Sequence, residues 1–268
     1  DKQPRRVGNV FGKIFQGLAT SKDDVYFLQD CNESNSIVTG YSNQLKRIVK
    51  IEKGLVRPLL KGEDVHRYDV ITTNRVVIFP YKIVEGKAVL YGENELKKLY
   101  PNGYSYLKEC ETILRNREKG HFNIDGAWFQ FGRKQGISSA EEIKLVAPDI
   151  SMGGNFALDI KGQFYQTTTI YGYIKYDNVK CSYKSLLALL NSHLCWWFMQ
   201  NTGNVMANGY FRYKPAYINP FPLPSDEAII AAEPIIEPLV DSLTYLYNKD
   251  NCDIYAHTSN KNLRLHFN

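Results

Sequence analysis

Glycine and proline recur along this chain at intervals that leave room for few long helices. Pro58 and Gly62 interrupt one stretch, and Gly132 and Gly162 mark further turns. Between such breaks lie short runs rich in β-branched and aromatic residues, for example RVVIFPYKI from Arg75. Runs of this kind, bounded by turn residues, are typical of strands. We therefore expect strands and hairpins over most of the chain.

The pattern also predicts where strands give way to helices. Residues 8–30 predict two short strands on either side of a polar turn at 21–24, and residues 128–176 predict hairpins. Pro234 and Pro238 are expected to break or kink the last of three predicted helices. These helices span about residues 94–119, 183–200 and 226–248. The fold class expected is α+β, β-rich with a helical C-terminal portion.

The composition predicts a folded protein in a reducing compartment. Hydrophobic residues make up 44% of the 268 residues, enough to build a sizeable core. The five cysteines are an odd number, lie far apart and form no CxxC pair, which argues against a disulfide framework and a zinc site. The longest apolar run, LLALLNSHLCWWFM from Leu186, is too short to span a bilayer. We therefore expect a cytoplasmic protein with no membrane partner.

One group of residues resembles the metal-binding motif of metal-dependent nucleases. Asp149, preceded by a proline, and the Asp159-x-Lys161 pair follow a pattern in which two carboxylates hold Mg²⁺ and a lysine supports the attacking water. The segment from Asp159 to Gly162 is equally typical of a hairpin turn. Both interpretations stay open: a Mg²⁺-dependent nuclease using Asp149, Asp159 and Lys161, or a structural turn.

Other motifs of catalysis are incomplete. Asn219-Pro220-Phe221 partly resembles the loop that holds a flipped adenine in amino-methyltransferases, but it lacks the second proline in its place. No glycine-rich loop follows a strand to bind S-adenosylmethionine, and the five histidines have no cysteine or carboxylate partners at ligand spacing. We therefore expect a chain that acts by binding, without a catalytic residue, metal or cofactor of its own.

Basic residues gather where turns are expected. Between residues 46 and 75, eight lysines and arginines accompany four acidic residues, within a net charge of +5 for the chain. Arg133 follows the aromatic run WFQF, and Arg212 and Lys214 flank Tyr213. Such residues can bind phosphate by charge or contact the edges of bases. The alternative interpretation is a solvated basic face.

Four segments follow one another in an order typical of one domain family. They are IFQGLATSKDDVYFL, VRPLLKGEDVHRYDV, the stretch from WFQFGRKQGI through EEIKLVAPDIS to FALDIKGQFYQTTTIYGYI, and the pair LLALLNSHLCWWFM and GYFRYKPAYINPFPLP. The second is close to the pattern Pro-x-Leu-basic-Gly-x-Asp-Ile/Val-x-Arg-Tyr, whereas the first has Ser21 where glycine is usual. Over about residues 8–225 the chain resembles the TaqI-like C-terminal specificity domain, the target recognition domain of adenine-specific DNA methyltransferases and fused type II restriction-modification enzymes.

The resemblance implies a DNA target recognition domain over residues 1–225, with an inserted helix at about 94–119. Residues 226–268 would add a C-terminal helix and tail to the same domain. A methyltransferase domain of the same parent chain would bind S-adenosylmethionine and receive the flipped adenine, and Mg²⁺ would serve a nuclease if the parent has one. Because the sequence opens with DKQPRR and no initiator Met, we expect a piece of such a parent. Its expected partner is double-stranded DNA.

The basic clusters supply the expected DNA contacts. We expect phosphate contacts from Arg57, Lys61 and Arg67, base reading by Arg133, Gln135 and Arg212, and further contacts from Lys134, Tyr210 and Lys214. In residues 209–224, alternation along an extended segment would bury some aromatic rings and leave Arg212 and Lys214 on one face. Three prolines would form a stiff exit into the last helix. One further alternative keeps this fold but gives it protein contacts in place of DNA.

Overall fold

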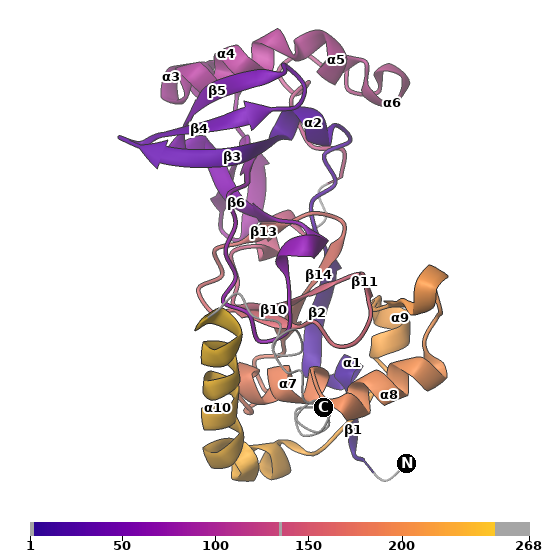
Figure 1. Ribbon diagram of the computed structural model, residues 1–268. Coiled ribbons are helices and arrows are strands. Elements are labelled where there is room, and N and C mark those ends of the chain that lie inside the picture. The colour runs from indigo at the N-terminus through magenta and orange to yellow at the C-terminus, as the bar shows by residue number, and fades with distance from the viewer. Residues whose placement is uncertain (1–2, 134–135, 250–268) are drawn as a thin grey trace.

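The computed structural model describes residues 3–133 and 136–249, which form an upper and a lower lobe (Figure 1). The upper lobe comprises residues 18–60, 75–133 and 136–142 together with 165–166, and the lower lobe comprises residues 3–17, 143–164 and 167–249. Each lobe has its own hydrophobic core. Residues 61–74 descend between the lobes, and Tyr68 in this segment is buried in the lower core. The chain therefore starts in the lower lobe, builds the upper one and returns.

The upper lobe is built on a six-stranded sheet in the order β13-β6-β7-β3-β4-β5. The strands are β3 (Phe27–Ser34), β4 (Ile37–Ser42), β5 (Arg47–Glu52), β6 (Val56–Leu60), β7 (Val76–Ile78) and β13 (Tyr165–Gln166). Neighbours are antiparallel except β13 and β6, which run parallel. Asn35 and Ser36, with φ of 48° and 64°, close the β3–β4 hairpin by a two-residue turn whose twist matches the strands. Because β13 comes from the second half of the chain, its pairing with β6 joins the lobes.

Short elements complete the upper lobe and confirm much of the predicted pattern. The run from Arg75 forms β7 and then β8 (Tyr81–Val84), which pairs with β9 (Lys87–Leu90). The two strands predicted in residues 8–30 are β2 (Phe11–Gln16) and β3, and the polar turn between them leads into α2 (Asp23–Tyr26). Three 3₁₀ turns follow, η1 (Lys53–Leu55), η2 (Gly62–Asp64) and η3 (Ile137–Ser139).

The helix predicted over 94–119 is wrong as one continuous element. It is divided into α3 (Glu93–Leu99), α4 (Pro101–Glu109), α5 (Glu111–Arg115) and α6 (Arg117–Gly120). Pro101 occupies the first position of α4, where its fixed φ starts a new helix. Glu118 and Lys119 adopt positive φ and end the helical run. The divided segment bends over the top of the sheet (Figure 1), and Tyr106 of α4 donates its hydroxyl to the backbone carbonyl of Val25 at 2.7 Å.

The aromatic run at residues 128–131 is not the strand that its pattern predicts. Trp128, Phe129 and Phe131 are buried in turns of irregular backbone. The buried side chain of Arg117 holds this backbone, because its guanidinium donates to the carbonyls of Trp128 and Gln130, each at 2.8 Å. It also donates to the carbonyls of Leu114 and Thr20. One charged side chain thus satisfies the backbone groups that a strand ladder would otherwise pair.

The lower lobe contains a four-stranded antiparallel sheet in the order β12-β10-β14-β2. Its other strands are β10 (Lys144–Pro148), β12 (Ala157–Asp159) and β14 (Ile170–Lys175). Two small pairs adjoin it, β1 (Arg5–Arg6) with β16 (Pro222–Leu223), and β11 (Ile150–Ser151) with β15 (Phe211–Arg212). Strands predicted over residues 128–176 are therefore present from β10 onward, but the predicted hairpins are wrong, because consecutive strands from β10 to β14 pair with other strands and not with each other.

Helices surround this sheet, and one predicted helix is again divided. The elements are α1 (Val7–Val10), α7 (Tyr183–Leu190), α8 (His193–Thr202), η4 (Ala207–Gly209), α9 (Pro215–Ile218) and α10 (Asp226–Lys249). The prediction of one helix over 183–200 is wrong because Asn191 exchanges two hydrogen bonds with the backbone of Phe156, at 2.8 and 2.9 Å. Ser192 then caps α8 by accepting from the N–H of Cys195.

The last helix, α10, continues through both of its prolines. Pro234 and Pro238 lie inside it, and the ribbon bends near its beginning (Figure 1), so of the two predicted outcomes, a break or a kink, the kink is the one observed. Ile229 and Val240 of α10 are buried in the lower core. The predicted division at residue 225 stays a prediction. Within the residues described, no helix is long and apolar enough to cross a membrane.

Candidate nucleic-acid interface

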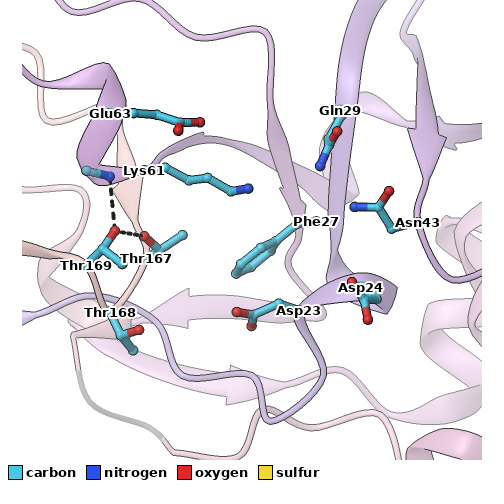
Figure 2. A pocket seen from close by; sticks show the side chains of 11 residues that line it. Asp23, Asp24, Phe27, Gln29, Asn43, Lys61, Glu63, Thr167, Thr168 and Thr169 are labelled. Atoms are coloured by element: carbon cyan, nitrogen blue, oxygen red, sulfur yellow. Dashed lines mark hydrogen bonds between the residues drawn. The ribbon is translucent and has the colours of Figure 1, made fainter.

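A cleft of about 390 Å³ opens beside the junction of the two lobes (Figure 2). Its walls come from α2 and the start of β3, from the turn between β4 and β5, from η2, and from the turn between β13 and β14. The lining residues are Asp23, Asp24, Phe27, Gln29, Asn43, Lys61, Gly62, Glu63, Thr167, Thr168 and Thr169. Apart from Phe27 and Gly62, all of them bring polar side chains, which suits a polar or charged ligand.

The three consecutive threonines form one wall and connect the cleft to the lower lobe. The hydroxyl of Thr169 accepts from the N–H of Gly62 at 3.0 Å and lies 2.7 Å from the hydroxyl of Thr167 (Figure 2). The backbone carbonyl of Thr169 accepts from the N–H of Asp149 at 2.8 Å. One turn therefore fixes both the start of η2 and the residue that follows β10.

Lys61 follows β6 and extends across the cleft. Its backbone N–H donates to Asp64 at 2.7 Å, which fixes the chain where η2 begins. Figure 2 shows the side chain passing above Phe27 toward Gln29 and Asn43. The ammonium has no acceptor among the residues that the structure describes. Its three N–H donors are therefore available to a ligand.

A second polar surface lies below the cleft, on the β11–β15 pair. In this antiparallel pair Ile150 is opposite Arg212 and Ser151 is opposite Phe211. Directly opposed residues share a face. Ser151 and Phe211 are buried, at 3% and 7% exposure, so the face that carries Ile150 and Arg212 is turned outward. Strand alternation thus presents Arg212 to solvent.

Asp149 orients Arg212 on this outward face. Oδ2 of Asp149 lies 3.0 Å from Nη2 of Arg212, and the arginine side chain keeps 37% of its surface exposed. Oδ1 of Asp149 and Nε of Arg212 are buried without a hydrogen-bond partner in the described structure. The ion pair therefore holds the guanidinium of Arg212 in place, while one acceptor of Asp149 and one donor of Arg212 stay unpaired beneath the surface.

The aromatic stretch around Arg212 confirms the predicted alternation. Phe211 and Tyr213 are buried, whereas Tyr210 is 41% exposed. Lys214 is half-buried and lies over the ring of Tyr217, with its ammonium 4.9 Å from the ring centre. The proline-rich exit differs from expectation in one respect, because Pro222 belongs to β16 and pairs with Arg6 of β1.

Arg67 and Arg133 flank the two polar surfaces. Nε of Arg67 donates to the carbonyl of Gly154 at 3.1 Å, in the turn that follows β11. Arg133 is exposed, and its backbone N–H donates to Ala19, next to the Leu18 that bridges to Thr167 in the cleft wall. The neighbouring candidates, Lys134 and Gln135, lie outside the described residues.

Arg57 is separated from this surface. It lies in β6, so its expected position in a loop is wrong. Its guanidinium is 5.4 Å from the ring centre of Phe79 and 3.4 Å from the carboxylate of Glu141. It also donates to the carbonyls of Gly54 and Val56. A phosphate contact from Arg57 would have to displace Glu141, and this assignment stays a prediction.

Comparisons with known proteins decide the family. A family model described as the TaqI-like C-terminal specificity domain matches residues 57–223, more than half of the chain. The chain belongs to this family. This confirms the resemblance found in the sequence.

Two relatives extend the comparison of the specificity domain. The type II restriction enzyme and methyltransferase RM.Eco57I of Escherichia coli is 26% identical over 215 residues, which cover 75% of this chain and 21% of that protein. The structure of the type IIL restriction-modification enzyme MmeI in complex with DNA is also similar. The match covers 92% of this chain and 30% of the MmeI chain, with a TM-score of 0.57 and 14% sequence identity. That similarity confirms the α+β fold. This chain spans about a fifth of the length of RM.Eco57I.

The nuclease alternative does not fit the geometry of this specificity domain. In the antiparallel pair of β10 and β12, Asp159 is opposite Lys144 at the start of β10, whereas Asp149 follows the end of β10. At roughly 3.3 Å per residue, their backbones are about 16 Å apart, too far to share one Mg²⁺. Asp159 bonds Lys144 at 2.7 Å, and Lys161 is exposed. Within residues 3–133 and 136–249, no three His, Cys, Asp or Glu side chains are grouped to hold a metal.

Sequence reasoning missed several residues of the cleft. Gln29 belongs to β3, Asn43 to the turn between β4 and β5, and Thr167 to Thr169 to a turn far along the chain. No local pattern marks these residues as neighbours. The run of three threonines was the available signal, and the parallel pairing of β13 with β6 is what brings it to the cleft.

Proposed function

We propose that this specificity domain binds duplex DNA and reads its sequence for a larger adenine-specific DNA methyltransferase of a type II, IIG-like restriction-modification system. A methyltransferase domain of the same parent would bind S-adenosylmethionine, and a nuclease domain, if present, would bind Mg²⁺. The domain itself would catalyse no step. The name of RM.Eco57I and the DNA bound to MmeI support this proposal. The free thiols of Cys31, Cys110, Cys181 and Cys195 support a cytoplasmic location.

The observation that carries the proposal is the outward position of Arg212. Asp149 holds it on one side, and Thr169 connects Asp149 to the cleft of Lys61. An arginine fixed in this way is suited to the two acceptors on the major-groove edge of guanine. The same surface includes the exposed ring of Tyr210. These groups therefore offer polar contacts both at the cleft and on the β11–β15 pair.

The flanking basic residues would hold the DNA backbone. Arg67 and Lys214 are half-buried, with part of their side chains open to solvent for phosphate contacts. Arg133 is exposed beside the cleft and remains the second base-reading residue of the proposal. Flipping an adenine costs a few kcal/mol of stacking and pairing. A domain that grips the duplex around the target offsets this cost for the catalytic domain.

Methylation by the complete parent protein tests the proposal. The parent gene is expressed in a host free of adenine methylation, and N6-methyladenine is mapped by long-read sequencing. We expect one methylated motif for the wild type, and for Arg212→Met a loss of discrimination worth about 1–3 kcal/mol at one base pair of that motif.

Arg47→Met is the matched control. Arg47 is exposed and ion-paired with Glu109 on the upper lobe, at the opposite edge of the sheet from β13. We expect this variant to keep the motif. An unchanged motif in Arg212→Met would remove Arg212 from base reading, and no methylation by an intact, folded parent would contradict the proposed function itself.

A further inference from the structure

Lys61 lies in surroundings that do not suit a phosphate. Three carboxylates line the same cleft, those of Asp23, Asp24 and Glu63, and Lys61 is the one lysine or arginine among its described lining residues. Arg75 neutralises Glu63 at 2.5 Å, and Lys22 lies 3.4 Å from Asp24. A phosphate bound by Lys61 would still face this acidic wall. Like charges at short range oppose such binding.

The side chains around Lys61 instead match the edges of bases. Figure 2 shows the ammonium of Lys61 directed toward the amides of Gln29 and Asn43, above the ring of Phe27. Across the described part of the chain, neither amide has a hydrogen-bond partner for its side chain. An ammonium offers donors alone, and an amide offers donors and an acceptor. This set can satisfy both the acceptors and the amino groups of base edges.

The carboxylates of the cleft can also take part in contacts to base edges. Asp24 is exposed at the cleft, and its carboxylate can accept a hydrogen bond from an exocyclic amino group. Base edges carry no net charge, so the carboxylates do not repel them. The arrangement favours a neutral ligand with both donors and acceptors over an anion.

We propose that this cleft is a base-reading site, in which Lys61 contacts the acceptors of one guanine and Gln29 or Asn43 contacts an adjacent adenine. Lysine donates to O6 and N7 of guanine, and asparagine and glutamine form paired bonds with N6 and N7 of adenine. The proposal rests on the proposed DNA-binding function. It moves Lys61 from phosphate contact to base reading and adds Gln29 and Asn43 to the specificity residues.

Salt dependence separates a base contact from a phosphate contact. Binding of the complete parent protein is measured at several salt concentrations on a duplex with its methylation motif, and on duplexes with each base pair of the motif changed. For Lys61→Met we expect discrimination at one G·C pair to fall roughly 5- to 150-fold. The slope of log affinity against log salt should stay as in the wild type.

Lys46→Met is the control, since Lys46 is an exposed lysine beside the cleft, on the turn that carries Asn43. We expect it to keep the discrimination at every base pair. Of Asn43→Ala and Gln29→Ala, the variant that removes the adenine contact should lower discrimination at an A·T pair next to the guanine. Lys61→Met should keep the thermal stability of the wild type, because its ammonium has no partner to lose among the described residues.

Two results would overturn this inference while leaving the proposed function intact. A slope reduced in magnitude by about 0.9, with equal loss of affinity on every duplex, would make Lys61 a phosphate contact. Unchanged slope and discrimination would place the cleft outside the DNA interface. A wild-type parent with no salt-dependent binding to any duplex would overturn both the proposed function and this inference.

Discussion

Two ion pairs lie at opposite ends of strand β10 and differ in how far water reaches them. At its first residue, Lys144 bonds Asp159 at 2.7 Å, with side-chain exposures of 0% and 1%. After its last residue, Asp149 bonds Arg212 at 3.0 Å, with exposures of 11% and 37%. Each pair joins an aspartate to a basic residue of another strand. Their surroundings therefore decide what each pair does.

Additional hydrogen bonds to the backbone satisfy both members of the buried pair. Lys144 also donates to the carbonyl of Ala140, and Asp159 accepts from the N–H groups of Gln163 and Phe164. Burial lowers the pKa of Lys144, and the nearby carboxylate of Asp159 opposes that change. The pair holds the turn from Asp159 to Gly162, so the interpretation of this segment as a structural turn is confirmed, although the strands on either side of it, β12 and β13, belong to different sheets.

In the partly exposed pair of Asp149 and Arg212, one atom of each side chain makes no hydrogen bond to a described residue. Oδ1 of Asp149 and Nε of Arg212 have no partner within the described residues, and the exposed part of Arg212 faces outward. The comparison teaches that two aspartates of one motif-like set lie in different surroundings. Complete enclosure makes one pair structural, and partial enclosure leaves Arg212 of the other pair in contact with solvent, where the proposed DNA contact would form.

Breaking the buried pair of Lys144 and Asp159 should lower the free energy of unfolding more than any other change predicted here. Lys144→Met leaves the Asp159 carboxylate without its cation in a site that excludes water, so we expect the free energy of unfolding to fall by about 3–5 kcal/mol. Urea denaturation followed by circular dichroism measures the loss. Lys161→Met, at an exposed lysine of the same turn, is the control and should change little. A loss below about 1 kcal/mol would mean that water reaches the pair.

Double-mutant cycles sharpen the comparison. We expect a coupling energy of about 1–3 kcal/mol between Lys144→Met and Asp159→Asn, because the two groups touch in a buried site. For Arg212→Met with Asp149→Asn, a coupling below about 1 kcal/mol is expected, since solvent screens a partly exposed pair. The same denaturation experiment gives both values. Equal couplings would refute the difference drawn between the two sites.

Among the variants that alter an ion pair, Asp149→Asn alone should change the free energy of unfolding least. Asparagine keeps the shape and one acceptor, so the unfolding free energy should change by about 0.5–1 kcal/mol. The variant should nevertheless reduce discrimination by the complete parent at the base pair that Arg212 reads, because the guanidinium loses its anchor. Binding to duplexes that differ at single base pairs measures this effect. Wild-type discrimination would show that Asp149 does not position Arg212.

Much of the fold followed from local signals. The run from Arg75 predicted the strands β7 and β8, and alternation in residues 209–224 predicted that some rings would be buried while Arg212 stayed accessible; Phe211 and Tyr213 are the buried rings. Pro101 is a local signal for the break between α3 and α4 that the prediction overlooked, whereas the break after α7 has a tertiary cause. Asn191 ends α7 through bonds to Phe156, which is 35 residues away in sequence. The strand expected at 128–131 likewise does not form, because Arg117 donates hydrogen bonds to the carbonyls of this segment.

The sequence by itself determined the family, the α+β class and the basic and aromatic segments, because these depend on residue order and on short-range periodicity. Tertiary structure alone decided which polar groups meet. Strand register separated Asp149 from Asp159, and the pairing of β13 with β6 brought Thr169 beside Gly62 at the cleft. The physical reason is that register and crossover pairing are set by burial across the whole fold, which no local segment of the sequence contains.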